Sequence, residues 1–387
     1  MTELALTGGA VEIIGALGFD ETETGIAPRR LPEWTRPQIP DPFMEFMVTL
    51  TSGVRLAFRT DSPWIELDAM PTGFSIVGMP APAITFDLVV DGVRVARETG
   101  DFGTRLVLDV MTNDVQVEQG EPALLRFDGA GALGELGGAM REVEIWLPQS
   151  AATELRSLRV ADGARVEAPT RERRRWAHYG SSISHCIEAH GPTDIWPAVA
   201  ARAGNVELLQ FGFAGQCHLD QFVARTIAAE EVDVISLKVG INVVNADSLT
   251  ERTFAPALHG FLDTLRDRHC ETPILVVSPI VCPMAEDHPG PTIPDGAGGF
   301  RVVDGGPVEL RAMSLTLRRI RTIIAEVIVA RQGRGDHNLH YLDGLELFGE
   351  ADAPTLPDGL HPDGDGYLRI GERFAAHAFA PDGPFAS

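Results

Sequence analysis

Hydrophobic positions along the chain follow two patterns that change near residue 170. Before about residue 165 they alternate with polar positions or form short apolar runs, as in WIELDAM (64–70) and AITFDLVV (83–90). Alternation with a period of two is typical of strands with one buried face. We predict strands at 11–17, 44–50, 54–60, 64–70, 83–90, 93–98, 104–110, 123–129 and 141–147. Asp91-Gly92 separates two of them at the spacing of a tight hairpin, and the whole set predicts an antiparallel β-sandwich or jelly roll over residues 1–168.

After residue 170, apolar runs alternate with longer amphipathic stretches. The predicted strands lie near 175–180, 206–211, 232–240, 273–280 and 340–347, and the predicted helices near 193–203, 218–230, 249–269 and 308–331. Strands that alternate with helices predict a parallel sheet that is covered on both faces. We therefore expect a three-layer α/β/α domain over residues 169–387.

Two segments stand outside these patterns. Residues 282–307 are rich in Pro and Gly, and a loop of this length inside a domain is typical of a lid or a binding loop. The junction between the halves carries four arginines in residues 171–175, which indicate a solvated linker or, alternatively, a contact for phosphate.

The composition excludes several classes of function. Of the 387 residues 44% are hydrophobic and 22% are charged, as expected for a globular chain with a sizeable core. The net charge of -23 argues against binding to nucleic acids or anionic membranes, because both need a basic surface. The N-terminal segment lacks the pattern of a signal peptide, and no stretch approaches the ~20 apolar residues of a membrane helix. Four cysteines without CxxC spacing are expected to be reduced, so we predict a cytoplasmic protein.

Residues that could take part in catalysis follow several of the predicted parallel strands. Ser182 comes after the first strand, Gly215 after the second and Asn242 after the third. Asp358 and His361 lie in a loop beyond the fifth strand. Because ligands of open parallel sheets bind beyond the carboxyl ends of the strands, we expect these five residues to lie together.

This set contains what nucleophilic catalysis needs. The hydroxyl of Ser182 is a weak nucleophile until a base contacts it, and His361 is the candidate base. Asp358 is the candidate group that orients the histidine and stabilises its imidazolium. The backbone N–H groups of Ser182 and Gly215 and the side-chain amide of Asn242 are candidate donors of an oxyanion hole.

Each of these residues also has a purely structural interpretation. Ser182 can cap a helix, and the glycine, asparagine, aspartate and histidine can be turn or surface residues. Their shared position at strand ends favours the catalytic interpretation. Cys186 is a rival nucleophile, but it lies four residues into a predicted helix, where we expect it to face the core.

The second half resembles the SGNH, or GDSL, hydrolase family, whose four sequence blocks carry Ser, Gly, Asn and His. The similar segments are GSSIS (180–184), FGFAGQC (211–217), GIN (240–242) and DGLHP (358–362). The resemblance covers about residues 175–380 and implies a flavodoxin-like sheet, Ser182 as nucleophile and His361 with Asp358 as its partners. The chain departs from the family at Ser181 and Val243, where aspartates are usual.

Two groups in this family join such a domain to a β-sandwich that resembles a carbohydrate-binding module. One contains carbohydrate esterases, and the other contains acyltransferases of tetracycline-like polyketide biosynthesis. The second group implies transfer of an aryl acyl group such as salicylyl from a coenzyme A thioester to a polyketide hydroxyl through acyl-Ser182. We predict acyl transfer. An esterase for a small acyl or carbohydrate O-acetyl ester is the alternative, and an inactive glycan-binding protein is a second one.

The expected ligands follow from this interpretation. Acyl-coenzyme A is expected as a donor substrate and a small-molecule alcohol as the acceptor. No bound cofactor is predicted, because the chain has no GxGxxG after a strand and no P-loop. No metal is predicted either, because His185 and His190 have no carboxylate at a useful spacing. Trp196, Phe213 and Val243 are candidate substrate contacts, with a place in the core as the alternative.

Overall fold

The structure of the chain, a computed structural model, describes residues 1–109, 112, 114–128, 138–303 and 313–386. Residues 304–312, which end the predicted lid segment and begin the predicted helix at 308–331, lie outside this part of the chain. The last residues of two predicted strands, 110 and 129, lie outside it as well.

The chain forms two compact units. The first contains Met1–Glu172 and His190–Thr193, and the second contains Arg173–Ala189 and Asp194–Ser387. The short segment His190–Thr193, which sequence patterning assigned to the second domain, therefore packs with the first unit. None of the helices in the described ranges combines the length and the apolar character needed to cross a bilayer.

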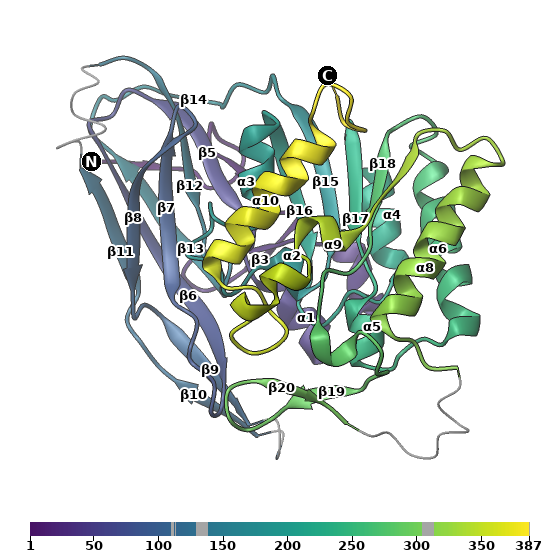
Figure 1. The fold of residues 1–387 in the computed structure, drawn as a ribbon. Coiled ribbons are helices and arrows are strands. Elements are labelled where there is room, and N and C mark those ends of the chain that lie inside the picture. The colour runs from purple at the N-terminus through teal and green to yellow at the C-terminus, as the bar shows by residue number, and fades with distance from the viewer. Residues whose placement is uncertain (110–111, 113, 129–137, 304–312, 387) are drawn as a thin grey trace. The chain divides into compact units, whose positions relative to one another are not determined.

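Two sheets build the first unit (Figure 1). The strands of the larger sheet are β1 (Thr2–Leu4), β3 (Gly18–Glu21), β4 (Ile26–Arg29), β6 (Trp64–Ile76), β9 (Thr104–Asp109), β10 (Asp114–Glu118), β11 (Ala123–Asp128) and β13 (Ala151–Val160). Their order is β10-β9-β6-β13-β4-β3, with β1 beside β13 and β11 beside β6. The strands of the smaller sheet are β2 (Glu12–Ile14), β5 (Arg55–Thr60), β7 (Ile84–Val90), β8 (Val93–Gly100), β12 (Arg141–Trp146) and β14 (Val166–Glu167). Their order is β14-β5-β12-β7-β8, with β2 beside β5.

The two sheets share one hydrophobic core. Leu56 and Phe86 from the smaller sheet pack in one cluster with Leu67 and Leu158 from the larger sheet, and all four are almost fully buried. Strand β6 alternates buried and half-buried residues along its whole length, as its sequence pattern predicts. Sheets that face each other across such a core form a β-sandwich, which confirms the predicted architecture of this half.

One strand pair corrects the expectation of a purely antiparallel sandwich. Strands β6 and β9 pair in parallel, whereas the other neighbouring strands of these two sheets are antiparallel among the described residues. The reason is that β7 and β8, which lie between β6 and β9 in the sequence, belong to the other sheet. The chain thus returns to the first sheet in the direction of β6.

The predicted hairpin at Asp91-Gly92 is confirmed. Val90 pairs with Val93, and the two residues between them have φ values of 48° and 80°. Positive φ at both central positions is what a type I′ turn requires, and Asp-Gly is a favoured sequence for it.

The predicted strand at 44–50 is wrong, because this segment forms helix α1 (Pro42–Thr49). Asp41 caps the helix by accepting a hydrogen bond from the backbone N–H of Met44 at 2.8 Å, and Pro42 occupies the first turn. Met44, Met47 and Val48 form the buried face at helical spacing. The cap and this spacing outweigh the short apolar run that suggested a strand.

The second unit is built on a parallel sheet, as predicted. Its strands are β15 (Arg174–Gly180), β16 (Val206–Gly212), β17 (Val234–Lys238), β18 (Ile274–Val277) and β21 (Leu339–Leu342), in the order β16-β15-β17-β18-β21. Neighbouring strands are parallel throughout. The longer helices are α3 (Trp196–Ala203), α4 (Gln221–Ala229), α6 (Glu251–Arg266), α8 (Leu317–Gln332) and α10 (Gly364–Ala378).

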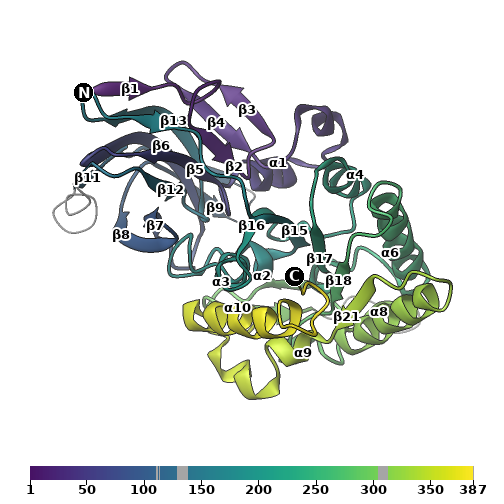
Figure 2. The same cartoon turned by 90° about the horizontal axis from the view of Figure 1, so that it is seen from above.

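These helices cover both faces of the sheet (Figure 2). Helices α3 and α10 pack together on one face, and α4, α6 and α8 pack together on the other. Side chains of β15 show the division: Trp176 stacks on Phe374 of α10, whereas Tyr179 stacks on Phe261 of α6. The three-layer α/β/α fold is therefore confirmed.

Short elements complete the second unit and correct two expectations. Residues 282–303 are not structureless, because they contain the 3-10 helix η3 (Pro283–Ala285) and a hairpin of β19 (Thr292–Pro294) and β20 (Phe300–Val302). The predicted strand at 340–347 ends at Leu342, and its second half forms helix α9. The remaining short helices are η1 (Glu33–Gln38), α2 (Ser182–His185), α5 (Ile241–Asn245), α9 (Gly344–Leu347) and η4 (Glu350–Thr355).

The ion pair between Asp87 and Arg97 is expected to stabilise the first unit, and this can be tested. Asp87 is fully buried and accepts two hydrogen bonds of 2.7 Å from Arg97 and one of 2.6 Å from the hydroxyl of Thr193. Removing Asp87 is destabilising, because it takes away the acceptor of the buried Thr193 hydroxyl and of the Arg97 guanidinium, whose side chain is only 25% exposed. We expect Asp87→Ala to lower the free energy of unfolding by about 3 kcal/mol, measured by urea denaturation of the intact chain.

Asp101→Ala is the matched control. Asp101 also pairs with an arginine in this unit, Arg105, but its side chain is 97% exposed, so we expect an unchanged urea midpoint. Equal midpoints for both variants would contradict the structural role of Asp87.

Candidate functional site

Ser182 is the first residue of helix α2, directly beyond the carboxyl end of strand β15. The helix can lie this close to the sheet because glycines stand below it. A Cβ atom at Gly180 would lie 2.1 Å from Oγ of Ser184, and one at Gly212 would lie 2.6 Å from the backbone nitrogen of His185. Larger residues at these positions would push the helix away, so the two glycines fix where Ser182 stands.

A buried network of hydrogen bonds anchors helix α2 to the sheet. His178 of β15 bonds through Nε2 to the hydroxyl of Ser184 at 2.8 Å and through Nδ1 to the hydroxyl of Ser236 at 2.7 Å. Ser236 also accepts a hydrogen bond from the indole of Trp176 at 2.8 Å. Burial holds the pKa of His178 well below its ordinary value, so this imidazole stays neutral. His178 therefore acts as a fixed connection between strand and helix.

His361 brings together two residues that the sequence places far apart. Its Nε2 lies 2.9 Å from Oγ of Ser182, and its Nδ1 lies 2.6 Å from Oδ2 of Asp358. The other carboxylate oxygen, Oδ1, accepts the backbone N–H groups of Leu360 at 2.8 Å and His361 at 2.7 Å. Asp358 is thus held by its own loop, and a neutral His361 carries its proton on Nδ1 and accepts from the serine at Nε2.

Burial and charge act against each other on His361. Burial is the largest single influence and lowers the pKa of the imidazole, because it disfavours the imidazolium. The charge of Glu188 and the hydrogen bond and charge of Asp358 outweigh burial and raise the pKa to about 9. For Asp358, burial raises the pKa, but the contacts with His361 and the two backbone donors lower it overall. The two groups therefore form a charged pair over much of the neutral range.

The loops after β15, β16 and β17 are connected by hydrogen bonds from backbone N–H groups. The N–H of Phe213 donates to the carbonyl of Gly180 at 2.9 Å, which joins the first two loops. The N–H of Cys217 donates to Oδ1 of Asn242 at 3.0 Å, which joins the second and third. With Oδ1 engaged in this way, the amide of Asn242 has a fixed orientation. Gly215 lies between Phe213 and Cys217, so the predicted residues of the three loops belong to one connected edge of the sheet.

Residues 282–303, which belong to the segment predicted as a lid or a binding loop, contact this site through Phe300, a residue that the sequence did not single out. The phenyl ring of Phe300 packs edge-on against the imidazole of His361 with ring centroids 5.6 Å apart. The backbone N–H of Phe300 donates to the carbonyl of Asp358 at 3.0 Å. The hairpin of β19 and β20 is thus attached to the loop that carries the histidine. The Pro- and Gly-rich composition indicated a loop but carried no signal for this contact.

A second carboxylate near His361 was also missed. Oε1 of Glu188 lies 3.8 Å from Nδ1 of His361, and Oε2 of Glu188 accepts a hydrogen bond of 2.8 Å from the hydroxyl of Tyr367. Glu188 and Tyr367 come from segments separated by almost half the chain and belong to none of the four blocks. Only the fold brings them together.

The other candidates from the sequence are buried away from solvent. Trp196, Phe213 and Val243 have no exposed surface, and the indole of Trp196 donates to the carbonyl of Ile183 at 2.8 Å. The structure thus places these three side chains in the core. Cys186 is likewise fully buried, and burial raises the pKa of its thiol well above the ordinary value, so it is not a reactive thiolate.

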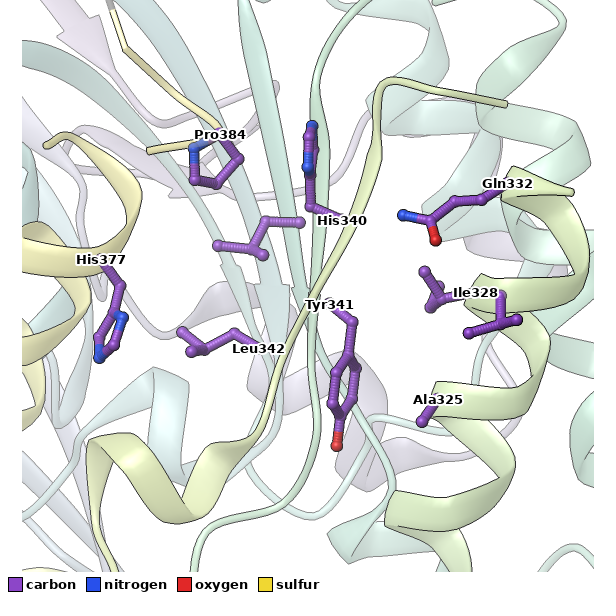
Figure 3. A pocket seen from close by; sticks show the side chains of 10 residues that line it. Ala325, Ile328, Gln332, His340, Tyr341, Leu342, His377 and Pro384 are labelled. Carbon is purple, nitrogen blue, oxygen red and sulfur yellow. The ribbon is translucent and has the colours of Figure 1, made fainter. Parts of the chain in front are cut away.

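Two cavities in the described part of the chain lie away from the predicted site residues. A cavity of about 360 Å³ lies at the edge strand β21, and its lining includes His340 and Tyr341 of that strand and Ile328 and Gln332 of α8 (Figure 3). A cavity of about 160 Å³ in the first unit includes Phe102, and it is smaller than the ~300–1,000 Å³ typical of ligand sites. In the described parts of the chain, no three His, Cys, Asp or Glu side chains are grouped so that they could hold a metal ion.

The arrangement at the sheet edge can activate a serine. A hydroxyl that contacts an unprotonated imidazole nitrogen can lose its proton as it attacks a carbonyl carbon. A carboxylate on the other imidazole nitrogen keeps the required tautomer and stabilises the charge that develops. Ser182, His361 and Asp358 have this geometry, and Ser182 and His361 are each only 8% exposed.

Comparisons with known proteins agree with this chemistry. Residues 173–285 match the GDSL-like lipase/acylhydrolase family. No curated protein sequence matches the chain. Among solved structures, the salicylyl-acyltransferase SsfX3 from a tetracycline biosynthetic pathway is similar with a TM-score of 0.78 and 28% identity, over 96% of this chain and 95% of that one.

Two esterases share the fold at lower identity. A family two carbohydrate esterase from Clostridium thermocellum, in complex with cellohexaose, has a TM-score of 0.58 and 12% identity over 94% of this chain and 97% of that one. The acetyl xylan esterase Est2A from the rumen bacterium Butyrivibrio proteoclasticus has a TM-score of 0.54 and 11% identity over 97% and 96%. The chain is thus similar to the GDSL-like lipase/acylhydrolase family over residues 173–285, and it is an enzyme of the acyltransferase or esterase type.

Proposed function

We propose that the chain is an O-acyltransferase that moves an aryl acyl group, such as salicylyl, from a coenzyme A thioester to a hydroxyl of a polyketide. The observation that carries the acyl-serine chemistry is the position of His361 between Oγ of Ser182 and the carboxylate of Asp358. Similarity to a salicylyl-acyltransferase over almost the full length of both chains favours transfer over hydrolysis. In this proposal the enzyme acts in the cytoplasm, where its thioester donor is found.

In the first half of the reaction, Ser182 becomes acylated. Its hydroxyl proton passes to Nε2 of His361 while Oγ forms a bond to the acyl carbon of the thioester. The oxyanion of the tetrahedral intermediate is stabilised by the N–H groups of Ser182 and Gly215 and the amide of Asn242. The C–S bond then breaks, and the leaving thiolate takes the proton from His361. Asp358 stabilises the imidazolium that exists between these steps.

In the second half, the acyl group leaves the serine. His361 accepts the proton of the acceptor hydroxyl while the acceptor oxygen attacks the acyl carbon. The bond to Oγ of Ser182 breaks, and the serine regains its proton from His361. Water in place of the alcohol yields the free acid, which is the reaction of the alternative, an esterase. An inactive glycan-binding protein is disfavoured, because such a role requires none of the contacts of His361.

The two neighbouring serines allow a direct test of the nucleophile. A fluorophosphonate probe should label Ser182, and Ser182→Ala should lose both labelling and at least about 10³-fold of turnover. Ser181→Ala should retain both, because the hydroxyl of Ser181 is buried and has no hydrogen-bond partner among the described residues. Labelling is read by peptide mapping. A labelled Ser182→Ala variant, or inactive Ser181→Ala with an intact fold, would refute this assignment.

The raised pKa of His361 predicts the pH dependence of the reaction. The free enzyme needs a neutral imidazole to accept the serine proton, and the imidazolium predominates below the pKa of about 9. We therefore expect kcat/KM to rise with pH, with a midpoint well above 6.5 and towards 9. The measurement is kcat/KM from pH 5.5 to 10 with the uncatalysed rate subtracted at each pH. An acid limb centred at or below 6.5 would contradict the predicted pKa.

A competition between water and alcohols tests the proposed transfer. Purified enzyme is given an aryl-coenzyme A thioester in water alone and then with panels of polyketide and sugar alcohols, and the products are identified by mass spectrometry. Ester that forms faster than free acid is the expected result and identifies the acceptor class. Free acid at a rate that no acceptor changes would establish the esterase instead.

A further inference from the structure

A second carboxylate lies on the Asp358 side of His361. Oε1 of Glu188 is 3.8 Å from Nδ1, whereas Oδ2 of Asp358 is 2.6 Å from the same nitrogen. The longer distance is outside hydrogen-bond range, so Glu188 acts on the imidazole through its charge. A charge of opposite sign at this distance stabilises the imidazolium.

Tyr367 holds this carboxylate in place. Its hydroxyl donates to Oε2 of Glu188 at 2.8 Å, and the tyrosine is fully buried in helix α10. Burial raises the pKa of Tyr367 well above its ordinary value, so the phenol keeps its proton and remains a donor. Glu188 itself is 36% exposed and is otherwise able to turn towards solvent. The buried tyrosine therefore fixes the distance between Glu188 and His361.

Among the groups that surround His361, the carboxylates of Glu188 and Asp358 are the charges that act on its imidazole. Ser182 of α2 and Phe300 of β20 also contact the imidazole, but neither carries a charge. In the described part of the chain, the ion pairs of His361 are those with Glu188 and Asp358. Burial keeps the nearby thiol of Cys186 neutral, because it raises the pKa of that group.

We propose that Glu188, held by Tyr367, is a positioning residue that stabilises protonated His361 and thereby sets the pH range of the acyl transfer. This inference rests on the proposed function. Asp358 orients the imidazole through a hydrogen bond, whereas Glu188 adds charge without occupying a hydrogen-bonding position. The histidine consequently holds a proton at neutral pH more strongly than Asp358 alone would cause. Removing Glu188 should then raise activity at pH values where His361 is mostly protonated and leave it unchanged where the imidazole is already neutral.

The first test measures the titration midpoint of His361 by NMR and does not depend on activity. The full-length protein is labelled at the 13Cε1 position of its 11 histidines, and the resonance of His361 is assigned by its absence in His361→Gln. We expect Glu188→Gln to lower the midpoint of the His361 titration by about one pH unit and Tyr367→Phe to lower it by less. An unchanged midpoint in Glu188→Gln overturns the inference.

Glu346→Gln is the matched control variant. Glu346 lies 3.6 Å from the exposed His377 in the same unit, so its removal changes another glutamate–histidine pair. The titration of His361 should stay at its wild-type midpoint in this variant. A shift of His361 as large as that in Glu188→Gln would mean a general effect of net charge and would overturn the inference.

The second test uses the pH profile of kcat/KM. At pH 7, on the rising limb, Glu188→Gln should exceed the wild type by up to about tenfold, because one pH unit changes the neutral fraction about tenfold. On the high-pH plateau this gain should disappear. A purely structural role for Glu188 would instead lower kcat/KM at every pH. If the wild type shows no turnover while the titration midpoint still falls, the proposed function fails and the effect of Glu188 on His361 stands.

Discussion

The site depends on the imidazole of His361, which contacts the hydroxyl of Ser182 and the carboxylate of Asp358 at the same time. Ser182 and His361 are separated by 179 residues along the chain, so their 2.9 Å contact exists only if the fold is correct. The parallel sheet provides it, because strands that run in one direction place their carboxyl ends at one edge. Every other feature of the site either holds these groups in position or adjusts their charge.

Neighbouring residues hold Ser182 and Asp358 in position. Helix α2 is fixed by His178 and by the glycines at 180 and 212, and Asp358 is fixed by the backbone of its own loop. Polar groups that are buried and fully bonded in this way are costly to displace, since breaking one bond leaves others without partners. The position of Ser182 is therefore set before any substrate binds, which lowers the cost of organising the reaction.

Much of the fold and of the candidate site could be predicted from the sequence. Alternating apolar positions identified most strands of the sandwich, and the alternation of strands and helices identified the parallel sheet. Ser182, Asp358 and His361 were predicted to lie together because each follows a strand of that sheet, and the structure places them in contact.

The remaining features depend on information that local patterns do not carry. The short apolar run of helix α1 fits a strand as well as a helix, and the cap at Asp41-Pro42 is the feature of the sequence that distinguishes the two. The parallel pairing of β6 with β9 depends on which sheet each strand joins. Glu188, Phe300 and Tyr367 approach His361 only through tertiary packing, and no spacing in the sequence relates them.

The proposed reaction requires a covalent acyl-enzyme, and capture of this intermediate tests it directly. The intact protein is mixed with an aryl-coenzyme A thioester, quenched in acid within milliseconds and analysed by mass spectrometry with peptide mapping. We expect a mass increase equal to one acyl group, located on Ser182 and removed when an alcohol acceptor is added before the quench. Turnover without any acylated serine, or an acyl group on another residue, would contradict it.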